Sequence, residues 1–109
     1  MSVIFGSLVL KVSDVSRAAQ FWSTALGYVS REGRPEFLGP ATGNGPEIHL
    51  DEDDRTHLDL WVDRDTTNVD AEVARLMSLG ARRVDWEYPD DADFVVLADT
   101  EGNLFCVIA

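Results

Sequence analysis

The sequence is poor in three features that would each point to a particular class of protein. It contains one cysteine, Cys106, which excludes an internal disulfide and fits a reducing compartment. It contains no run of about 18 apolar residues, and its first five residues lack the basic start of a secretory signal. Basic residues are also few, because nine Lys and Arg stand against twenty Asp and Glu, for a net charge of −11. We therefore expect a cytoplasmic protein whose partner is neither a nucleic acid nor a membrane.

The length and composition suit one compact domain. The 109 residues are 45% hydrophobic and 27% charged, which is ordinary for a globular domain. Each half of the chain, at roughly 50 residues, would be only marginally stable alone. We therefore expect residues 1–109 to form a single domain.

An internal repeat divides this domain into two modules. Residues 8–14, Leu-Val-Leu-Lys-Val-Ser-Asp, return as residues 58–64, Leu-Asp-Leu-Trp-Val-Asp-Arg. A repeat of this length indicates two similar supersecondary units. We place the first module at about residues 1–52 and the second at about residues 55–109, and a ligand cavity at the junction of such modules is the usual arrangement.

Both modules read as β-α-β-β-β. In the first, Asp14 can cap a helix over about residues 15–26, and Gly27 can end it in a left-handed conformation. In the second, Thr67 or Asn68 can cap a helix that ends at Gly80. The predicted strands lie at about 3–12, in three short pieces between 28 and 50, around 58–62, and at about 82–87, 93–98 and 104–109.

Alternation within the strands predicts one apolar face and one polar face. The apolar face should pack under the helices, and it carries Leu8, Leu10 and Val12 with their copies Leu58, Leu60 and Val62. The other face carries the residues that we expect to line the cavity, which are Ser7, Lys11, His49, His57, Asp59, Trp61 and Cys106. This face is too polar to be a second hydrophobic core, so a cavity wall is the better interpretation.

In these features the chain resembles the vicinal oxygen chelate superfamily, which includes glyoxalase I, extradiol dioxygenases and the bleomycin- and fosfomycin-resistance proteins. The resemblance covers nearly the whole chain and rests on Val12–Asp14, Arg17–Trp22, Leu26–Tyr28, His57–Val62, Leu79–Ala81 and Asp99–Asn103. Residues 97–99 and 105–107 look most like small glyoxalase-like domains. The resemblance implies an α+β fold of two βαβββ modules, whose mixed sheets curl around a central cavity with the helices on the outer face. It also implies a homodimer, which short strands with open sheet edges favour as well.

Metal-dependent members of this superfamily hold a divalent ion through a His or Gln on the first strand, a Glu on the fourth, a His on the fifth and a Glu on the eighth. These positions fall on Ser7, on or next to His49, on His57 and on Cys106, and only His57 matches by residue type. The resemblance therefore implies an incomplete metal site. His49, His57 and Cys106 remain candidates for a three-ligand zinc site, whereas a buried, inert Cys106 and a cavity-lining His57 are the alternatives.

The sequence leaves two kinds of function open and names no catalytic residue. One is a small-molecule binding protein without a metal cofactor, in which Asp59 and Trp61 meet a cationic or aromatic ligand. The alternative is an enzyme, either a metal-dependent lyase, isomerase or dioxygenase acting on two vicinal oxygens, or a metal-free enzyme with Asp59 or His57 as general base. Because ligand-type residues are missing at two or three of the four positions, the sequence favours the binding protein.

Overall fold

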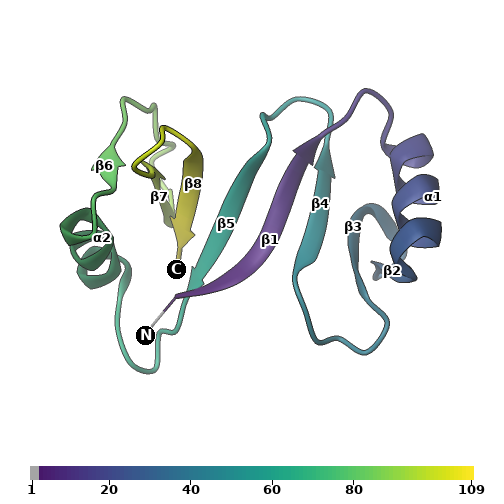
Figure 1. Ribbon diagram of the computed structural model, residues 1–109, viewed down its shortest axis with the longest axis horizontal. Coiled ribbons are helices and arrows are strands. Elements are labelled where there is room, and N and C mark those ends of the chain that lie inside the picture. The colour runs from purple at the N-terminus through teal and green to yellow at the C-terminus, as the bar shows by residue number, and fades with distance from the viewer. Residues whose placement is uncertain (1–2) are drawn as a thin grey trace. The chain divides into compact units, whose positions relative to one another are not determined.

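The computed structural model describes residues 3–109, which form two helices and eight strands in an α+β fold (Figure 1). These residues divide into two compact units. The N-terminal unit comprises residues 6–56, and the C-terminal unit comprises residues 57–109 together with residues 3–5. Neither of the two helices is long and apolar enough to cross a membrane, as far as the described residues go.

The N-terminal unit is a four-stranded mixed sheet with one helix. Its elements are β1 (Val3–Lys11), which belongs to this unit from Gly6 onward, α1 (Val15–Leu26), β2 (Tyr28–Arg31), β3 (Arg34–Pro40) and β4 (Glu47–Asp51). The strands lie in the order β2-β3-β4-β1; β1 and β4 run parallel, and the other neighbours run antiparallel. This is the β-α-β-β-β module that the sequence predicts.

Helix α1 begins and ends at the predicted residues. Asp14 has an extended backbone, and its side chain accepts a hydrogen bond from the N–H of Arg17. Gly27 ends the helix with a φ of 68°, which a residue without a side chain adopts readily. The inner side of the helix packs on the sheet, in a core of Leu10, Val12, Val15, Ala18, Ala19, Trp22, Tyr28, Leu38, Ile48 and Leu50.

The C-terminal unit repeats the same plan. Its elements are β5 (His57–Val62), α2 (Val69–Ser78), β6 (Arg82–Arg83), β7 (Phe94–Ala98) and β8 (Leu104–Ile108). The strands lie in the order β5-β8-β7-β6, with β5 and β8 parallel and the other neighbours antiparallel. Strand for strand, β5, β6, β7 and β8 correspond to β1, β2, β3 and β4, so the repeat in the sequence is also a repeat of structure.

Helix α2 is capped by Asn68 rather than Thr67. The Asn68 side chain accepts the N–H of Ala71, whereas the Thr67 hydroxyl donates to Glu72 at 3.1 Å. Glu72 is 4% exposed and also accepts from Nε of Arg75 at 3.0 Å. The buried carboxylate is therefore satisfied from two sides within the helix and its N-terminal turn.

Two details differ from the sequence prediction. Strand β6 covers only Arg82–Arg83, because the chain then leaves the sheet in a segment that contains Pro89, a residue without an N–H to donate. Within this segment the Tyr88 hydroxyl accepts the N–H of Val96 on β7 at 2.8 Å. Leu58, predicted to pack under the helix, is 39% exposed, since the core of this unit gathers around Leu60 and Val62 further along β5.

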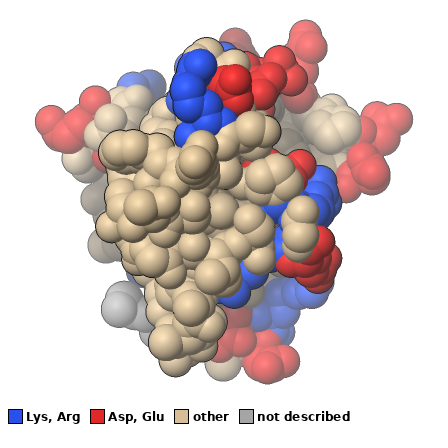
Figure 2. Space-filling model, turned by 90° about the vertical axis from the view of Figure 1, so that its right-hand side faces the viewer, with Lys and Arg blue, Asp and Glu red and all other residues tan. Residues whose placement is uncertain are grey.

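The outward side of α1 is almost free of charge. Arg17 is the only charged residue in the helix, and Figure 2 shows the broad surface without Lys, Arg, Asp or Glu on this side of the unit. Phe21 and Leu26 are 62% and 48% exposed, and Phe21 meets the ring of Trp22 edge to face at 5.0 Å. The helix thus presents apolar side chains both to its own sheet and to the outside.

A glycine on β3 makes room for an ion pair on the other face of the sheet. Nε of Arg31 lies 3.1 and 3.2 Å from the two carboxylate oxygens of Glu47, and its Nη2 donates to the carbonyl of Pro40 at 2.8 Å. A Cβ at Gly39 would collide with the Glu47 carboxylate and would lie 2.7 Å from Cζ of Arg31. Any other residue at this position would therefore push the pair apart.

We expect Gly39→Ala to lower the free energy of unfolding by about 1 kcal/mol, because the added methyl group displaces a partly buried ion pair. Urea denaturation of the variant and the wild type measures this change. When Glu47→Ala is already present, the same methyl group meets no carboxylate and only the Arg31 guanidinium, which has lost its ion-pair partner, so the additional loss should be smaller. An equal loss in both backgrounds would contradict the explanation.

Candidate functional site

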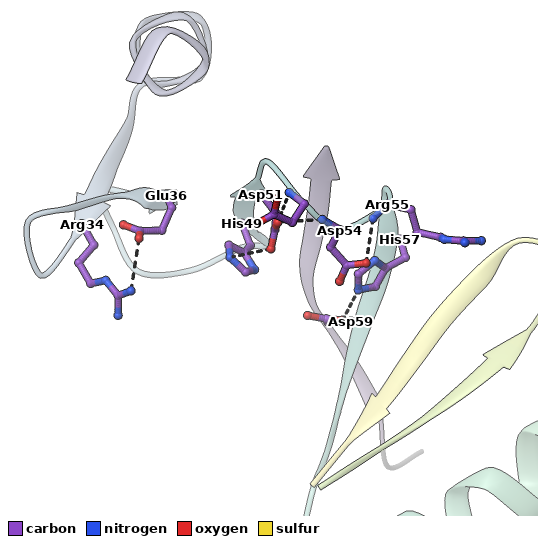
Figure 3. A network of polar contacts seen from close by, with 9 residues as sticks. Arg34, Glu36, His49, Asp51, Asp54, Arg55, His57 and Asp59 are labelled. Atoms are coloured by element: carbon purple, nitrogen blue, oxygen red, sulfur yellow. Dashed lines mark hydrogen bonds and ion pairs between the residues drawn. The ribbon is translucent and has the colours of Figure 1, made fainter. Parts of the chain in front are cut away.

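The polar face of the C-terminal unit brings together three side chains with different chemistry. Asp59 on β5 lies opposite Cys106 on β8, and His57 shares the face of Asp59 because side chains two apart in a strand point the same way. Nε2 of His57 lies 3.3 Å from Oδ1 of Asp59, and these side chains are only 10% and 15% exposed. One ligand-type atom from each of the three residues lies within 4.8 Å of the other two. Figure 3 shows His57 and Asp59 directed toward each other from β5.

Trp61 extends this face by one more position. It follows Asp59 by two residues on β5, and it is 41% exposed. The strand therefore offers an accessible aromatic ring next to a largely buried carboxylate. Such a combination can attract a cation or a flat ring, since the face of an indole carries negative charge density.

The corresponding face of the N-terminal unit is organised around His49. The Phe37 ring on β3 stacks on the His49 ring with a centroid distance of 4.5 Å, and the Arg34 guanidinium lies 4.8 Å from the centre of Phe37. Nε2 of His49 lies 3.9 Å from Oδ2 of Asp51, and a dashed line in Figure 3 marks this contact. His49 is thus held between an aromatic ring and a carboxylate of its own unit.

The remaining predicted site residues, Ser7 and Lys11, lie on β1 of the N-terminal unit. Ser7 is 7% exposed and pairs in register with Glu47. Lys11 is exposed, and its Nζ donates to the carbonyl of Glu52 at 2.9 Å. Their role in lining a cavity stays a prediction, as it does for His49, His57, Asp59, Trp61 and Cys106.

Two further residues on the polar face, Arg31 and Phe37, were not predicted from the sequence. Their contacts depend on the pairing of β2, β3 and β4, in which Phe37 stands opposite His49. The alternation of Glu47 with His49 and Asp51 was visible in the sequence and indicates a shared face. No local pattern in the sequence indicates which residue of β3 would contact His49 on this face.

The strand register decides whether the four-ligand metal centre of related proteins fits this chain. Val9 pairs with His49 between β1 and β4, and Asp59 pairs with Cys106 between β5 and β8, so His49 and Cys106 are structural counterparts. An imidazole and a thiol thus stand at the two positions where the metal-dependent proteins carry glutamates, and the Ser7 hydroxyl is a weak ligand. The donor set present does not fit that carboxylate-containing centre.

Asp51 is the acidic residue of the polar face whose charge the structure stabilises most clearly. Its Oδ1 accepts the backbone N–H groups of Asp53 and Asp54 at 2.8 and 2.9 Å. These two donors, that of Asp54 first, hold the pKa of the Asp51 carboxyl below its usual range, with smaller help from His49 and Lys11. The carboxylate therefore fixes the loop that follows β4.

We expect Asp51→Asn to lower stability near neutral pH and to have a vanishing effect in acid. A carboxyl whose pKa is depressed by folding stabilises the protein above its unfolded-state pKa, and this contribution is lost as the pH falls through the folded-state pKa. Urea midpoints of the variant and the wild type across this range measure the difference. Asp53→Asn removes the same charge from the same loop but leaves the acceptor in place, so a similar loss in that control would contradict the assignment.

Comparison with known proteins agrees with the fold. A family model described as Glyoxalase-like domain matches residues 7–108. Methylmalonyl-CoA epimerase from Mycobacterium tuberculosis is 20% identical, with a TM-score of 0.60 over 95% of this chain and 85% of that chain. Hypothetical protein SA1046 from S. aureus is 19% identical, with a TM-score of 0.39 over 93% and 89% of the two chains. A member of the glyoxalase/bleomycin resistance protein/dioxygenase superfamily from Sphaerobacter thermophilus DSM 20745 is 18% identical, with a TM-score of 0.39 over 96% and 95%.

No curated protein sequence matches the chain. At 20% identity and a TM-score of 0.60, the epimerase shows a likeness of fold alone, and the two structures with TM-scores of 0.39 carry no argument. The family model, in contrast, spans nearly the whole sequence, from the middle of β1 to the end of β8. The chain therefore belongs to the glyoxalase-like domain family.

Proposed function

We propose that this protein binds a small cationic or aromatic molecule on the polar face of β5, without the four-ligand metal centre of its metal-dependent relatives. The observation that supports this most is the pairing of a largely buried Asp59 with an accessible Trp61 on one strand face. His57 holds the carboxylate in place from 3.3 Å. A cation over the indole ring gains from both the ring and the carboxylate, and the net charge of −11 attracts it from a distance.

A metal-dependent lyase, isomerase or dioxygenase is the alternative function, and it has less support. Its chemistry requires an ion that polarises two vicinal oxygens of the substrate. Of the four positions that hold this ion in related enzymes, only the one occupied by His57 has the expected residue type. The epimerase named above shares the fold of this chain but at 20% identity lends no argument for its reaction.

We expect a panel of cationic aromatic compounds to include a ligand whose affinity falls roughly tenfold in Trp61→Leu and in Asp59→Asn, as the loss of a cation–π contact or a paired charge predicts. Isothermal titration calorimetry in the presence of a metal chelator measures this directly.

Trp86→Leu is the matched control, because Trp86 is also exposed, at 38%, but lies outside β5. It should bind as the wild type does. The proposal fails if no compound in the panel binds, or if Trp61→Leu retains full affinity.

We also propose that the protein is a cytoplasmic homodimer in which α1 meets a second copy. Two copies with a net charge of −11 each repel one another, so contact is least costly where a surface carries little charge. The outward side of α1 is such a surface, and it exposes Phe21 and Leu26 (Figure 2). The presence of only one cysteine in the sequence supports residence in the reducing cytoplasm.

Light scattering coupled to size-exclusion chromatography should show a dimer that Phe21→Glu converts to a monomer. The glutamate of each copy would face either the glutamate of the other copy or an apolar surface across the contact, and both arrangements are unfavourable. Met77→Glu places the same charge on an exposed apolar position of α2 and should leave the dimer intact. A wild-type protein that is monomeric at high concentration would refute this proposal.

A further inference from the structure

We infer that His57, Asp59 and Cys106 form a binding site for a thiophilic divalent cation of the Zn²⁺ class, built by the C-terminal unit alone. This set differs from the one that the family resemblance implies, because Asp59 replaces both Ser7 and His49. The inference does not rest on the ligand proposed above, which requires Trp61 and no metal.

The geometry of one ligand pair already matches a tetrahedral zinc site. Two nitrogen or oxygen ligands at about 2.0–2.2 Å from Zn²⁺ lie roughly 3.4 Å apart when the angle between them is tetrahedral. Nε2 of His57 and Oδ1 of Asp59 lie 3.3 Å apart. These two atoms would therefore need almost no movement to share one ion.

The third ligand is close enough to complete the set. The ligand-type atoms of the three residues lie within 4.8 Å of one another. A zinc-bound thiolate sits at about 2.3 Å from the ion and hence roughly 3.6 Å from its neighbouring ligands. A small rotation of the Cys106 side chain closes the difference.

The backbone holds these ligands on a rigid frame. Strands β5 and β8 pair in parallel with Asp59 directly opposite Cys106, so their separation is fixed by the sheet. His57 stands two residues before Asp59 on the same face. Side chains that are 10% and 15% exposed also keep water from weakening the attraction to an ion.

The donor chemistry selects the class of cation. A thiolate and an imidazole favour Zn²⁺ or Co²⁺ over Mg²⁺ or Ca²⁺, which prefer oxygen ligands only. The thiolate and the carboxylate of Asp59 together balance the double positive charge. Three protein ligands leave one coordination position for water or a small molecule, as in zinc sites that remain open.

The same contacts would also arise from an ion pair between His57 and Asp59 beside an unligated thiol. Alkylation of the thiol distinguishes the two arrangements, because Cys106 is the only cysteine in the sequence. The rate at which iodoacetamide alkylates the folded protein therefore reports on one known residue.

We expect one equivalent of Zn²⁺, added to chelator-treated protein, to slow this alkylation at least tenfold. Co²⁺ should produce a thiolate-to-cobalt charge-transfer absorption that Cys106→Ser abolishes. His57→Gln and Asp59→Asn should each weaken Zn²⁺ affinity at least tenfold, measured by competition with a chromophoric chelator. His49→Gln is the matched control, since His49 is the structural counterpart of Cys106 and also faces a carboxylate, and it should bind Zn²⁺ as the wild type does.

The inference is wrong if Zn²⁺ leaves the alkylation rate unchanged or if Co²⁺ gives no charge-transfer band, and both measurements use the wild-type protein and so do not depend on a variant that folds. It is equally wrong if His49→Gln weakens binding as much as His57→Gln. Trp61→Leu should bind Zn²⁺ with the affinity of the wild type. Cys106→Ser should bind any organic ligand as the wild type does when a chelator is present. The metal site and the proposed ligand site can therefore fail separately.

Discussion

The burial of one face of each sheet under a single helix is the constraint on which the rest of this structure depends. A strand places successive side chains on opposite faces, so each strand that packs under a helix must alternate apolar residues with residues that face the other way. On β8, Phe105 and Val107 are buried in the core with α2, and Cys106 between them is directed to the polar face. The same rule directs His57 and Asp59 of β5 away from the helix. The packing of the core therefore determines which face of the sheet carries the polar side chains of the candidate site.

The two copies of the module share their frame and differ in their polar faces. The apolar positions Leu10 and Val12 of the first copy return as Leu60 and Val62, and all four lie against the core of their unit. On the polar face, Val9 corresponds to Asp59 and His49 to Cys106. On this face, the N-terminal unit carries a stack of Arg34, Phe37 and His49. The C-terminal unit instead carries an imidazole, a carboxylate and a thiol close together.

The sequence predicted those features of the fold that arise from local signals. The caps Asp14 and Gly27 fix α1 through contacts within a few residues, and the alternation of Ile48 with His49 is read directly from the chain. The pairing of strands is different, because it joins residues that are far apart. No local pattern says that Phe37 contacts His49, or that Asp59 stands opposite Cys106, so the sequence could name candidate residues but not the contacts between them. The early end of β6 likewise follows from Tyr88 and Pro89, whose effect depends on where β7 lies.

The hydroxyl of Tyr88 has a consequence for how this protein behaves in a crowded solution. Strand β6 pairs with β7 only at Ala98 and Leu97, which would leave the next N–H groups of β7 as an open template for a strand from another molecule. The Tyr88 hydroxyl occupies the N–H of Val96, and its ring lies 5.5 Å from that of Phe94 on the same strand. A side chain from the irregular segment thus occupies one backbone donor of the edge that the short strand leaves open. The N–H of Val96 is therefore not available to a strand from a second molecule.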